Sequence, residues 1–288
     1  MRVLLTGYSG FIGSRFLEYN KDKYDIIPQN LRSCQISEIV WTEFDAVVHM
    51  AGKAHKMPRG EKVENYDINW TLTQDLAIAA KKNGVRHFIY LSSLKVFDDD
   101  LAFIDDTTPL NPISHYGLSK LKAEDLLREM SSSDFKVAII RPPVVYGPGV
   151  KGNMLRLLKI CETPWPLPFK SATNGRSMVY LDNLIEFINR VIDVRAEGSF
   201  FSNDLEAIST NKLVSLIRVN MNRKVKVFRL PDLVLWGLRN IKPNIIKRLY
   251  DSFVVDVRNT NKQLQFIPPY ATEIGVKKMV DWYLNDCD

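Results

Sequence analysis

Two side chains four residues apart, Tyr116 and Lys120, could carry out acid–base chemistry together. They fall in a segment with helical spacing, so a phenol and an ammonium would share one face of a helix. A nearby cation favours the phenolate, and we therefore expect Lys120 to lower the pKa of Tyr116 toward the working pH. Alone, the pattern Y-x-x-x-K usually indicates a surface pair. Whether it is catalytic therefore depends on the strands and helices around it.

Two serines, Ser92 and Ser93, stand at the end of a predicted strand, residues 85–93, one crossover before the tyrosine and lysine. The carboxyl end of such a strand is where ligands bind in a parallel sheet. A serine hydroxyl there can hydrogen-bond the same substrate oxygen as Tyr116. Serine, tyrosine and lysine beside a nicotinamide are the groups needed to move a hydride at a carbon that bears oxygen.

The first predicted strand, residues 2–6, runs directly into a turn with three glycines spaced by three, Gly7, Gly10 and Gly13. Gly7 lets the backbone turn sharply, Gly10 lets a pyrophosphate approach the backbone, and Gly13 lets the next helix pack close to the strand. The N–H groups at the start of that helix then face the anion. The turn therefore predicts a dinucleotide site.

The second predicted strand, residues 24–30, ends where a dinucleotide fold usually carries an acidic residue for the adenosine ribose. Asn30 takes that place, and Arg32 follows two residues later. An amide does not repel phosphate, and a guanidinium can pair with a 2′-phosphate. The pattern favours NADP(H) over NAD(H), with a turn asparagine and a solvated arginine as the alternative interpretation.

Strands and helices alternate from residue 2 to residue 141, which predicts a parallel sheet with right-handed crossovers. The predicted fold class is α/β, a Rossmann-type doubly wound parallel sheet with a smaller C-terminal mixed domain that binds substrate. We expect residues 1–145 to form the dinucleotide-binding domain, with residues 177–200 crossing back to it. Residues 146–288 are then the substrate-binding domain.

The composition of the 288 residues, 45% hydrophobic and 25% charged, is that of an ordinary globular protein, with a net charge of +6. Its Lys and Arg residues form no dense basic run, so we expect no nucleic-acid partner. Cys34, Cys161 and Cys287 lie far apart, which indicates free thiols in a reducing compartment and no metal site. No apolar run approaches the ~20 residues that span a bilayer, and we expect a cytoplasmic protein without membrane insertion.

Three further segments carry polar groups that could reach a ligand. His49 lies within an apolar strand, where a buried structural histidine is the more common role. The loop Lys53-Ala-His55-Lys56 could hold substrate phosphates or be solvated. Residues 233–250 are amphipathic and basic and could lie on a membrane surface, but Pro243 interrupts them. We expect a packed helix pair that covers the substrate cleft.

Six motifs occur in order along the chain: Thr6-Gly-Tyr-Ser-Gly-Phe-Ile-Gly13, His49-Met-Ala-Gly52, Asn69, Leu91-Ser-Ser93, Tyr116-Gly-Leu-Ser-Lys120 and Arg141-Pro-Pro-Val-Val-Tyr-Gly-Pro-Gly149. Together they resemble the extended short-chain dehydrogenase/reductases, and among them the NAD-dependent epimerase/dehydratase branch that acts on nucleotide sugars. The resemblance covers almost the whole chain, and the G-x-x-G-x-x-G spacing belongs to this branch.

The resemblance implies a role for each matching residue. Ser93, Tyr116 and Lys120 are the catalytic triad, and Ser93 also contacts the substrate, a UDP-sugar. Other substrate contacts would come from Asn153, near the sugar diphosphate, from Arg176, at a nucleotide phosphate, and from Arg258. Cofactor contacts are expected from Gly7, Gly10, Phe11, Ile12, Gly13, Asn30, Arg32, Ala51, Gly52, Asn69, Tyr116, Lys120 and Pro143. A homodimer with a four-helix interface is also expected from relatives.

Departures from the family pattern narrow the expected reaction. Leu94 and Lys95 follow Ser93 where the 4,6-dehydratases carry Asp-Glu, so the acid and base for dehydration are missing. The lack of an acidic residue at position 30 argues against the tightly held NAD of the 4-epimerases. The other motifs look most like the 4-ketoreductases that form UDP-N-acetylquinovosamine-type sugars for surface polysaccharides.

We therefore expect NADPH to reduce the C4 keto group of a UDP-4-keto-6-deoxy-N-acetylhexosamine. Tyr116 would protonate the oxyanion, Ser93 would orient it, and Lys120 would hold the nicotinamide ribose. A UDP-hexose or UDP-N-acetylhexosamine 4-epimerase, with the same triad and tightly bound NAD, is the alternative. A non-catalytic nucleotide-sensing regulator is a remote alternative, because such proteins usually lose the Tyr–Lys pair.

Overall fold

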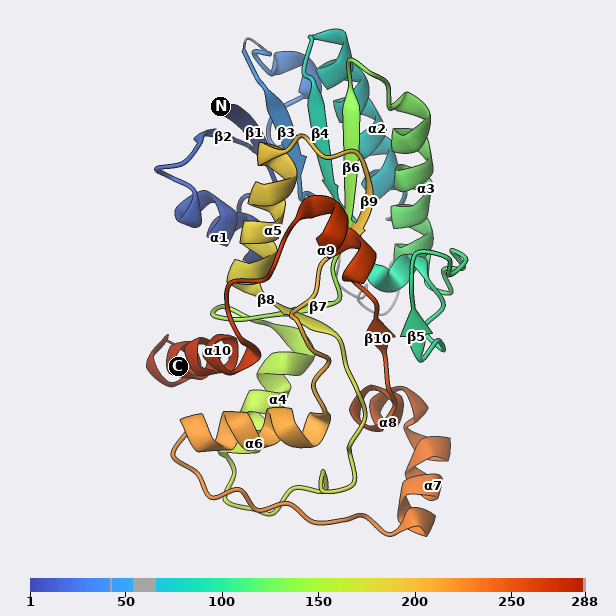
Figure 1. Cartoon of the computed structure of the whole chain (residues 1–288), viewed down its shortest axis with the longest axis vertical. Coiled ribbons are helices and arrows are strands. Elements are labelled where there is room, and N and C mark those ends of the chain that lie inside the picture. Colours follow the sequence, from blue (N-terminus) through green and yellow to red (C-terminus); the bar gives the residue numbers. More distant parts are fainter. Residues whose placement is uncertain (42, 54–65, 287–288) are drawn as a thin grey trace.

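The computed structural model describes residues 1–41, 43–53 and 66–286. Its centre is a six-stranded parallel sheet with the strand order β2-β1-β3-β4-β6-β9 (Figure 1). The chain winds outward from β1 in both directions, to β2 on one side and to β3 on the other, which is the doubly wound pattern. The predicted α/β fold of Rossmann type is confirmed. The strands are β1 Arg2–Thr6, β2 Asp25–Gln29, β3 Ala46–His49, β4 His87–Leu91, β6 Lys136–Arg141 and β9 Gly198–Phe201.

Helices cover both faces of this sheet because successive side chains of each strand point to opposite sides. In β4, Phe88 and Tyr90 share a core with α2 and α3, whereas Ile89 and Leu91 share another core with α1 and α5. All four strand residues are buried, as expected for a strand enclosed on both faces. These helices are α1 Phe11–Tyr19, α2 Asp67–Lys82, α3 His115–Met130 and α5 Leu181–Asp193.

A smaller region lies at one end of the sheet (Figure 1). Its core contains Leu158 of α4, Ile217 of α6 and Met279 of α10, packed with Tyr146 and Tyr180 of a two-stranded sheet, β7 and β8. The remaining elements are β5 Phe103–Ile104, β7 Val144–Tyr146, β8 Met178–Tyr180, β10 Val254–Val255, α4 Gly152–Glu162, α6 Thr210–Asn220, α7 Asp232–Ile241, α8 Pro243–Tyr250, α9 Arg258–Leu264, α10 Thr272–Asp286, and the short 3-10 helices η1 Ile36–Glu38 and η3 Leu94–Val96.

Helix α5 begins at Leu181, because the three residues before it, 178–180, pair with β7 as strand β8. The amphipathic stretch 233–250 forms the expected pair of helices, α7 and α8, interrupted at Pro243. They meet at Lys242, whose φ of −134° and ψ of 55° are not helical, since a proline disfavours helical geometry in the residue before it.

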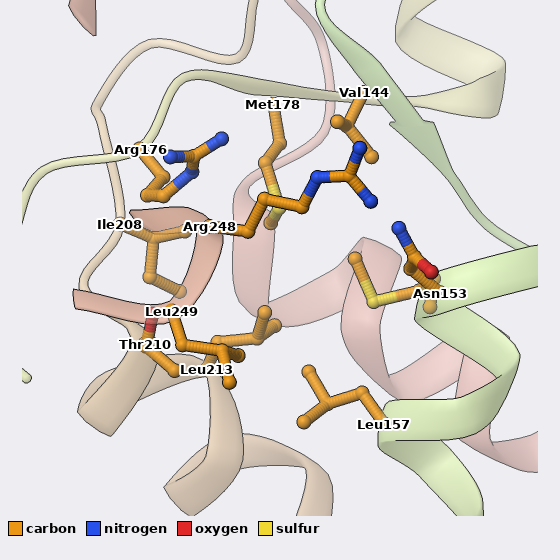
Figure 2. A pocket seen from close by; sticks show the side chains of 11 residues that line it. Val144, Asn153, Leu157, Arg176, Met178, Ile208, Thr210, Leu213, Arg248 and Leu249 are labelled. Atoms are coloured by element: carbon orange, nitrogen blue, oxygen red, sulfur yellow. The ribbon is translucent and has the colours of Figure 1, made fainter. Parts of the chain in front are cut away.

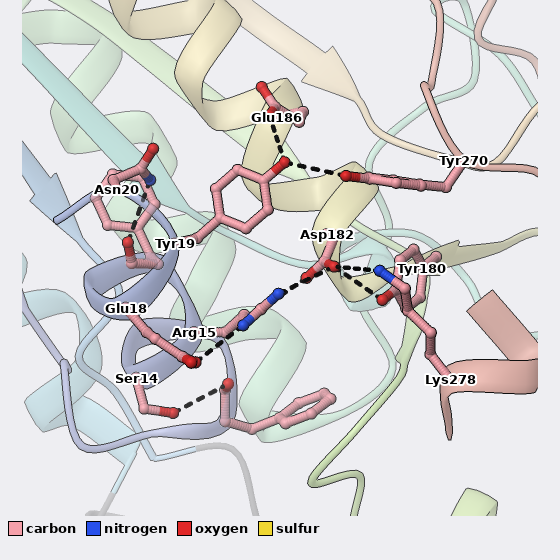
Figure 3. A network of polar contacts seen from close by, with 12 residues as sticks. Ser14, Arg15, Glu18, Tyr19, Asn20, Tyr180, Asp182, Glu186, Tyr270 and Lys278 are labelled. Atoms are coloured by element: carbon pink, nitrogen blue, oxygen red, sulfur yellow. Dashed lines mark hydrogen bonds and ion pairs between the residues drawn. The ribbon is translucent and has the colours of Figure 1, made fainter. Parts of the chain in front are cut away.

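Helix α1 is fastened to α5 by charged and phenolic groups (Figure 3). Arg15 donates two hydrogen bonds to the buried carboxylate of Asp182, over 2.7 and 3.1 Å, and Tyr19 donates to Glu186 over 2.6 Å. Tyr180 donates to Asp182 as well, over 2.8 Å. Burial acts to raise the pKa of Asp182, but the bonds from Arg15 and Tyr180 outweigh it and lower that pKa. The network fixes the direction in which α1 leaves β1.

Within the described ranges, no helix combines the length and the apolar character needed to cross a membrane. The same ranges contain no group of three or more His, Cys, Asp or Glu side chains placed to hold a metal ion. Cys34 and Cys161 are free thiols, and Cys287 lies outside the described residues.

Adding one methyl group at Gly13 should disrupt the packing of α1 against β1. A Cβ at this position would lie 2.2 Å from the carbonyl oxygen of Gly7, and backbone must move to admit it. We expect Gly13→Ala to lower the free energy of unfolding in urea by about 1–3 kcal/mol or more. The control is Gly237→Ala in α7, where a Cβ meets nothing within 4 Å and alanine favours the helix by up to ~1 kcal/mol. Equal losses in both variants would contradict the packing argument.

Candidate active site

The glycine turn lies at the carboxyl edge of the sheet, between β1 and α1. Gly7 has a φ of +75°, and a Cβ there would lie 2.6 Å from the backbone nitrogen of Ala51, just past β3. Gly10 is exposed and caps α1 without a side-chain hydrogen bond to the first helical turn. The first N–H groups of α1 are therefore free to bind an external anion, and no side chain at Gly10 obstructs it. This cradle fits the pyrophosphate of a dinucleotide.

Three residues named from the sequence as cofactor contacts converge one strand further along. A Cβ on Gly52 would lie 3.3 Å from Oδ1 of Asn69 and 3.5 Å from Nζ of Lys120. Asn69 is buried in α2, where its amide accepts from the backbone N–H of Lys53 over 2.7 Å and donates to Ser119 over 3.1 Å. These bonds hold the backbone after β3 against α3, so Gly52 lies directly beside the lysine.

Asn30 lies at the end of β2, next to the glycine turn, because Gln29 pairs with Thr6 in the sheet. Its side chain accepts a hydrogen bond from the backbone N–H of Arg32 over 3.0 Å, and the Arg32 side chain is exposed. Both residues thus stand at the strand end where a dinucleotide ribose is bound in this fold. The hydrogen bond also makes Asn30 a turn residue, which is the alternative interpretation of this position.

Tyr116 is in the first turn of α3 and is hydrogen-bonded to Ser93, which caps the short helix η3 after β4. Burial raises the pKa of Tyr116 to about 12, and the bond with Ser93 only reduces this rise. The expectation that the pKa of Tyr116 is lowered is therefore wrong. At neutral pH the phenol is protonated and can donate its proton to an oxyanion.

Lys120 explains why that expectation failed. Its ammonium is buried, donates to the carbonyl oxygen of Leu91 over 2.9 Å, and lies 4.6 Å from the ring centroid of Tyr90. The ammonium is thus directed to the end of β4 and not to the phenol of Tyr116. Burial lowers the pKa of Lys120 to about 8, while the carboxylate of Glu124 acts in the opposite direction.

A buried carboxylate positions these groups. Glu124, four residues after Lys120 on α3, accepts from Ser92 over 2.5 Å and from Arg141 over 2.6 and 3.1 Å. Arg128 also donates to it over 2.5 Å. Because Ser92 ends β4 and Arg141 ends β6, the carboxylate joins two strand ends to the helix that carries the tyrosine and lysine.

A cleft of about 530 Å³ opens at Ser93. Three more residues expected from the sequence line it: Pro143 as a cofactor contact, and Asn153 and Arg176 as substrate contacts. Helix α8 forms the opposite part of the wall with Asn244, Lys247 and Arg248, so the prediction that this helix pair covers the cleft holds for α8. Helix α7 contains no buried residue.

A smaller apolar pocket of about 130 Å³ adjoins the cleft and shares Val144, Asn153, Arg176 and Arg248 with it (Figure 2). Arg176 donates to the backbone oxygen of Asp251 over 3.2 Å, and its pKa is lowered by burial and then by the charge of Arg248. Two guanidinium groups that repel each other across a pocket form a ready site for a phosphate or diphosphate. Sequence reasoning missed Arg248, although it lies in the basic stretch 233–250.

Other residues named from the sequence lie elsewhere. Arg258 is 89% exposed and pairs with Asp256 over 2.6 Å, and it does not line the cleft, so the structure gives its substrate role no support. His49 is a buried structural residue as predicted, bonded to Thr6 over 2.6 Å and to Thr73 over 2.9 Å. Phe11 and Ile12 pack partly buried against the cores at the start of α1. His55 and Lys56 lie outside the described residues.

Comparison with known proteins identifies the family. Residues 3–200 match the model of the NAD dependent epimerase/dehydratase family. The chain belongs to this family.

Two curated relatives align with most of the chain. A UDP-glucose 4-epimerase of Vibrio cholerae is 32% identical over 98% of this chain and 95% of its own length. An N-acetyl-alpha-D-glucosaminyl-diphospho-ditrans,octacis-undecaprenol 4-epimerase of Escherichia coli O157:H7 is 33% identical over 80% of this chain and 75% of its own length. The fold also matches the crystal structure of UDP-glucuronic acid 4-epimerase from Bacillus cereus in complex with NAD, with a TM-score of 0.80, 20% identity, and coverage of 100% and 98% of the two chains.

The buried ammonium of Lys120 should make stability depend on pH. Its pKa of about 8 lies below that of an unfolded lysine, 10.5. Between these values the unfolded chain binds more protons than the folded protein, so the free energy of unfolding should rise with pH, by about 1.4 kcal/mol per unit at most. Urea denaturation between pH 7.5 and 10.5 should show this rise in the wild type and not in Lys120→Met. The exposed Lys262→Met should follow the wild type, and three parallel profiles would refute the assignment.

Proposed function

We propose that this protein is a 4-epimerase of a hexose or N-acetylhexosamine carried on a diphosphate, such as a UDP-sugar, with NAD(H) as the cofactor. The observation that carries the proposal is one continuous cleft. It brings Ser93, the hydrogen-bond partner of Tyr116, together with the two guanidinium groups of Arg176 and Arg248. Relatives named as 4-epimerases, aligned over 98% and 80% of the chain, support the same reaction.

The reaction needs one proton to move at the C4 oxygen of the sugar. Burial keeps the Tyr116 phenol protonated in the protein without cofactor, so the forward step requires the phenolate, which the positive charge of an oxidised nicotinamide beside it would favour. As the phenolate, Tyr116 accepts the proton of the C4 hydroxyl when the C4–H bond is broken, and it returns that proton to the same oxygen when the bond forms again on the other face. Ser93 holds this oxygen by a hydrogen bond, and its contact with Tyr116 keeps the two hydroxyls together. When bound, the nicotinamide supplies the acceptor and then the donor of the hydride.

The residues that would hold the cofactor are those around the glycine turn. The first N–H groups of α1 face its pyrophosphate, and Gly52 with Asn69 and Lys120 borders its nicotinamide end. Lys120 is the only one of these three with a charge, and it has hydrogen-bonding capacity for ribose hydroxyls beyond its bond to Leu91.

The diphosphate would bind between Arg176 and Arg248. Without a ligand the two guanidinium charges repel each other. An anion bound between them would attract both and so offset this repulsion. Asn153, at the start of α4, lies on the same pocket wall (Figure 2) and can bind a phosphate or sugar oxygen. Dehydration is not proposed, because Leu94 is buried and Lys95 pairs with Asp99 over 2.7 Å where an acid–base pair would be needed.

A 4-ketoreductase that uses NADP(H) is the second candidate. The observation that favours it is the strand end at Asn30, which carries an amide, followed by the exposed guanidinium of Arg32. A 2′-phosphate could bind there, whereas the two hydroxyls of an NAD ribose would find no carboxylate at this position.

Replacing the Tyr116 hydroxyl should separate chemistry from binding. We expect Tyr116→Phe to lower kcat by at least about 100-fold and to leave the affinity for the dinucleotide, measured by calorimetry, within about twofold. Interconversion of UDP-glucose or UDP-N-acetylglucosamine with its C4 epimer, without net cofactor consumption, supports the epimerase. Stoichiometric NADPH consumption on the 4-keto-6-deoxy sugar, without such interconversion, means the reductase. Full activity of Tyr116→Phe would reject both.

The two arginines of the cleft should determine substrate affinity. Arg176→Ala and Arg248→Ala should each raise the KM for the sugar nucleotide about 10-fold or more, with a smaller change in kcat, because a charge-assisted bond to phosphate is lost. Arg258→Ala is the control, and its KM should equal that of the wild type. A raised KM in Arg258→Ala alone would move the phosphate from Arg176 to Arg258, the second candidate from the sequence.

A further inference from the structure

Helix α7 and the start of α8 carry large apolar side chains that the protein does not cover. The exposed fractions are 78% for Leu233, 66% for Trp236, 72% for Ile241 and 52% for Ile245, and Val234 is 45% exposed. We call these five residues the apolar face. No residue of α7 is buried, although the helix has the composition of a core helix.

The apolar face lies on the outer side of α7. At 100° per residue, Leu233, Val234 and Ile241 fall within about 100° of the helix circumference, and Trp236 widens this arc to about 160°. Leu235 and Leu238, on another side, are half-buried against the protein. Figure 1 shows α7 at the end of the molecule opposite the six-stranded sheet, so this helix lies far from the dinucleotide-binding region.

Charge is concentrated around the same helices. Residues 223–251 contain eight Lys and Arg residues and two Asp residues, a net charge of +6. The other 259 residues contain 31 cationic and 31 anionic side chains, so the whole net charge of the protein lies in this one segment. Lys224, Lys226, Arg229 and Lys242 are exposed beside or at the ends of α7.

We propose that α7 and the start of α8 dock on the surface of an anionic phospholipid bilayer. An apolar face with tryptophan, bordered by lysine and arginine, is the pattern of helices that lie in the headgroup region, where the apolar side chains enter the acyl boundary and the cations bind lipid phosphates. The charge complementarity selects an anionic membrane over an apolar protein surface, because an apolar surface would not match the excess of positive charge beside α7. This docking goes beyond the proposed reaction and does not depend on it.

The same segment reaches the cleft. Helix α8 follows α7 after the single residue Lys242, and it places Lys247 and Arg248 in the wall of the cleft. Ile245, in the first turn of α8, belongs to the apolar face, and Arg248 lies one turn later. One helix therefore connects the docking surface with the candidate diphosphate site, which brings that site close to the membrane surface.

Co-sedimentation of the full-length protein with vesicles tests the proposal. We expect binding to vesicles of 70% phosphatidylcholine and 30% phosphatidylglycerol at 150 mM NaCl, at least about tenfold weaker binding to pure phosphatidylcholine, and loss of binding at high salt. The variant Leu233→Gln with Trp236→Gln and Ile241→Gln should lose binding to both kinds of vesicle. Lys226→Glu with Lys242→Glu should lower only the affinity for the anionic vesicles, by about tenfold.

Matched controls remove general effects of exposed residues. Ile267→Gln replaces an isoleucine that is 75% exposed on another part of the surface, and Lys262→Glu reverses an exposed lysine of α9, so both should bind as the wild type does. All variants should keep the Tm and the dinucleotide affinity of the wild type. Absent binding, equal binding to neutral vesicles, or equal losses in the control variants would overturn the proposal. So would a sedimentation-velocity dimer that only the triple glutamine variant dissociates, since the occupant would then be a second copy of the chain.

Discussion

The carboxylate of Glu124 is the interaction on which the candidate site depends. It is fully buried and receives hydrogen bonds from Ser92, Arg141 and Arg128. A buried carboxylate with three donors favours the one arrangement that satisfies all of them, because a buried charge without an ionic partner costs roughly 3–5 kcal/mol. Since Ser92 follows β4 and Arg141 ends β6, the carboxylate sets the distance between these two strand ends and α3, which carries the tyrosine and lysine. The site is thus built on a fixed charge and not on flexible loops.

Much of this arrangement could be predicted from local sequence. The glycine turn, the strand that ends in two serines and the tyrosine and lysine four residues apart are each contained within a few consecutive residues. The local backbone geometry of each motif therefore determines which ligand groups or side chains it can contact. Three strands of the large sheet, predicted at residues 2–6, 24–30 and 85–93, lie within two residues of those bounds for the same reason, as each is a short apolar run between polar turns. Strand β8 was missed because residues 178–180 extend only by pairing with β7, more than 30 residues earlier.

The parts that were missed depend on contacts between distant residues. Arg248 interacts with Arg176 although it lies 72 residues later in the chain, and no local spacing in the sequence predicts this interaction. Arg258 was a second candidate after Arg176, but Asp256 two residues before it holds the side chain at the surface. The position of Lys120 on α3 was predicted correctly. The direction of its ammonium was not, because the ammonium donates to the carbonyl oxygen of Leu91. Sequence thus predicted which groups are present, and tertiary structure determined which of them face one another.

The location of the net charge has a consequence for how the molecule moves. With all six excess charges in residues 223–251 and a balanced remainder, the protein is an electric dipole whose positive end contains α7 and α8. Near a negatively charged plane such a dipole experiences a torque before any atoms touch, within the ~8 Å over which physiological salt leaves a field unscreened. The molecule therefore rotates during its approach and arrives with one end first, so fewer collisions occur in unproductive orientations.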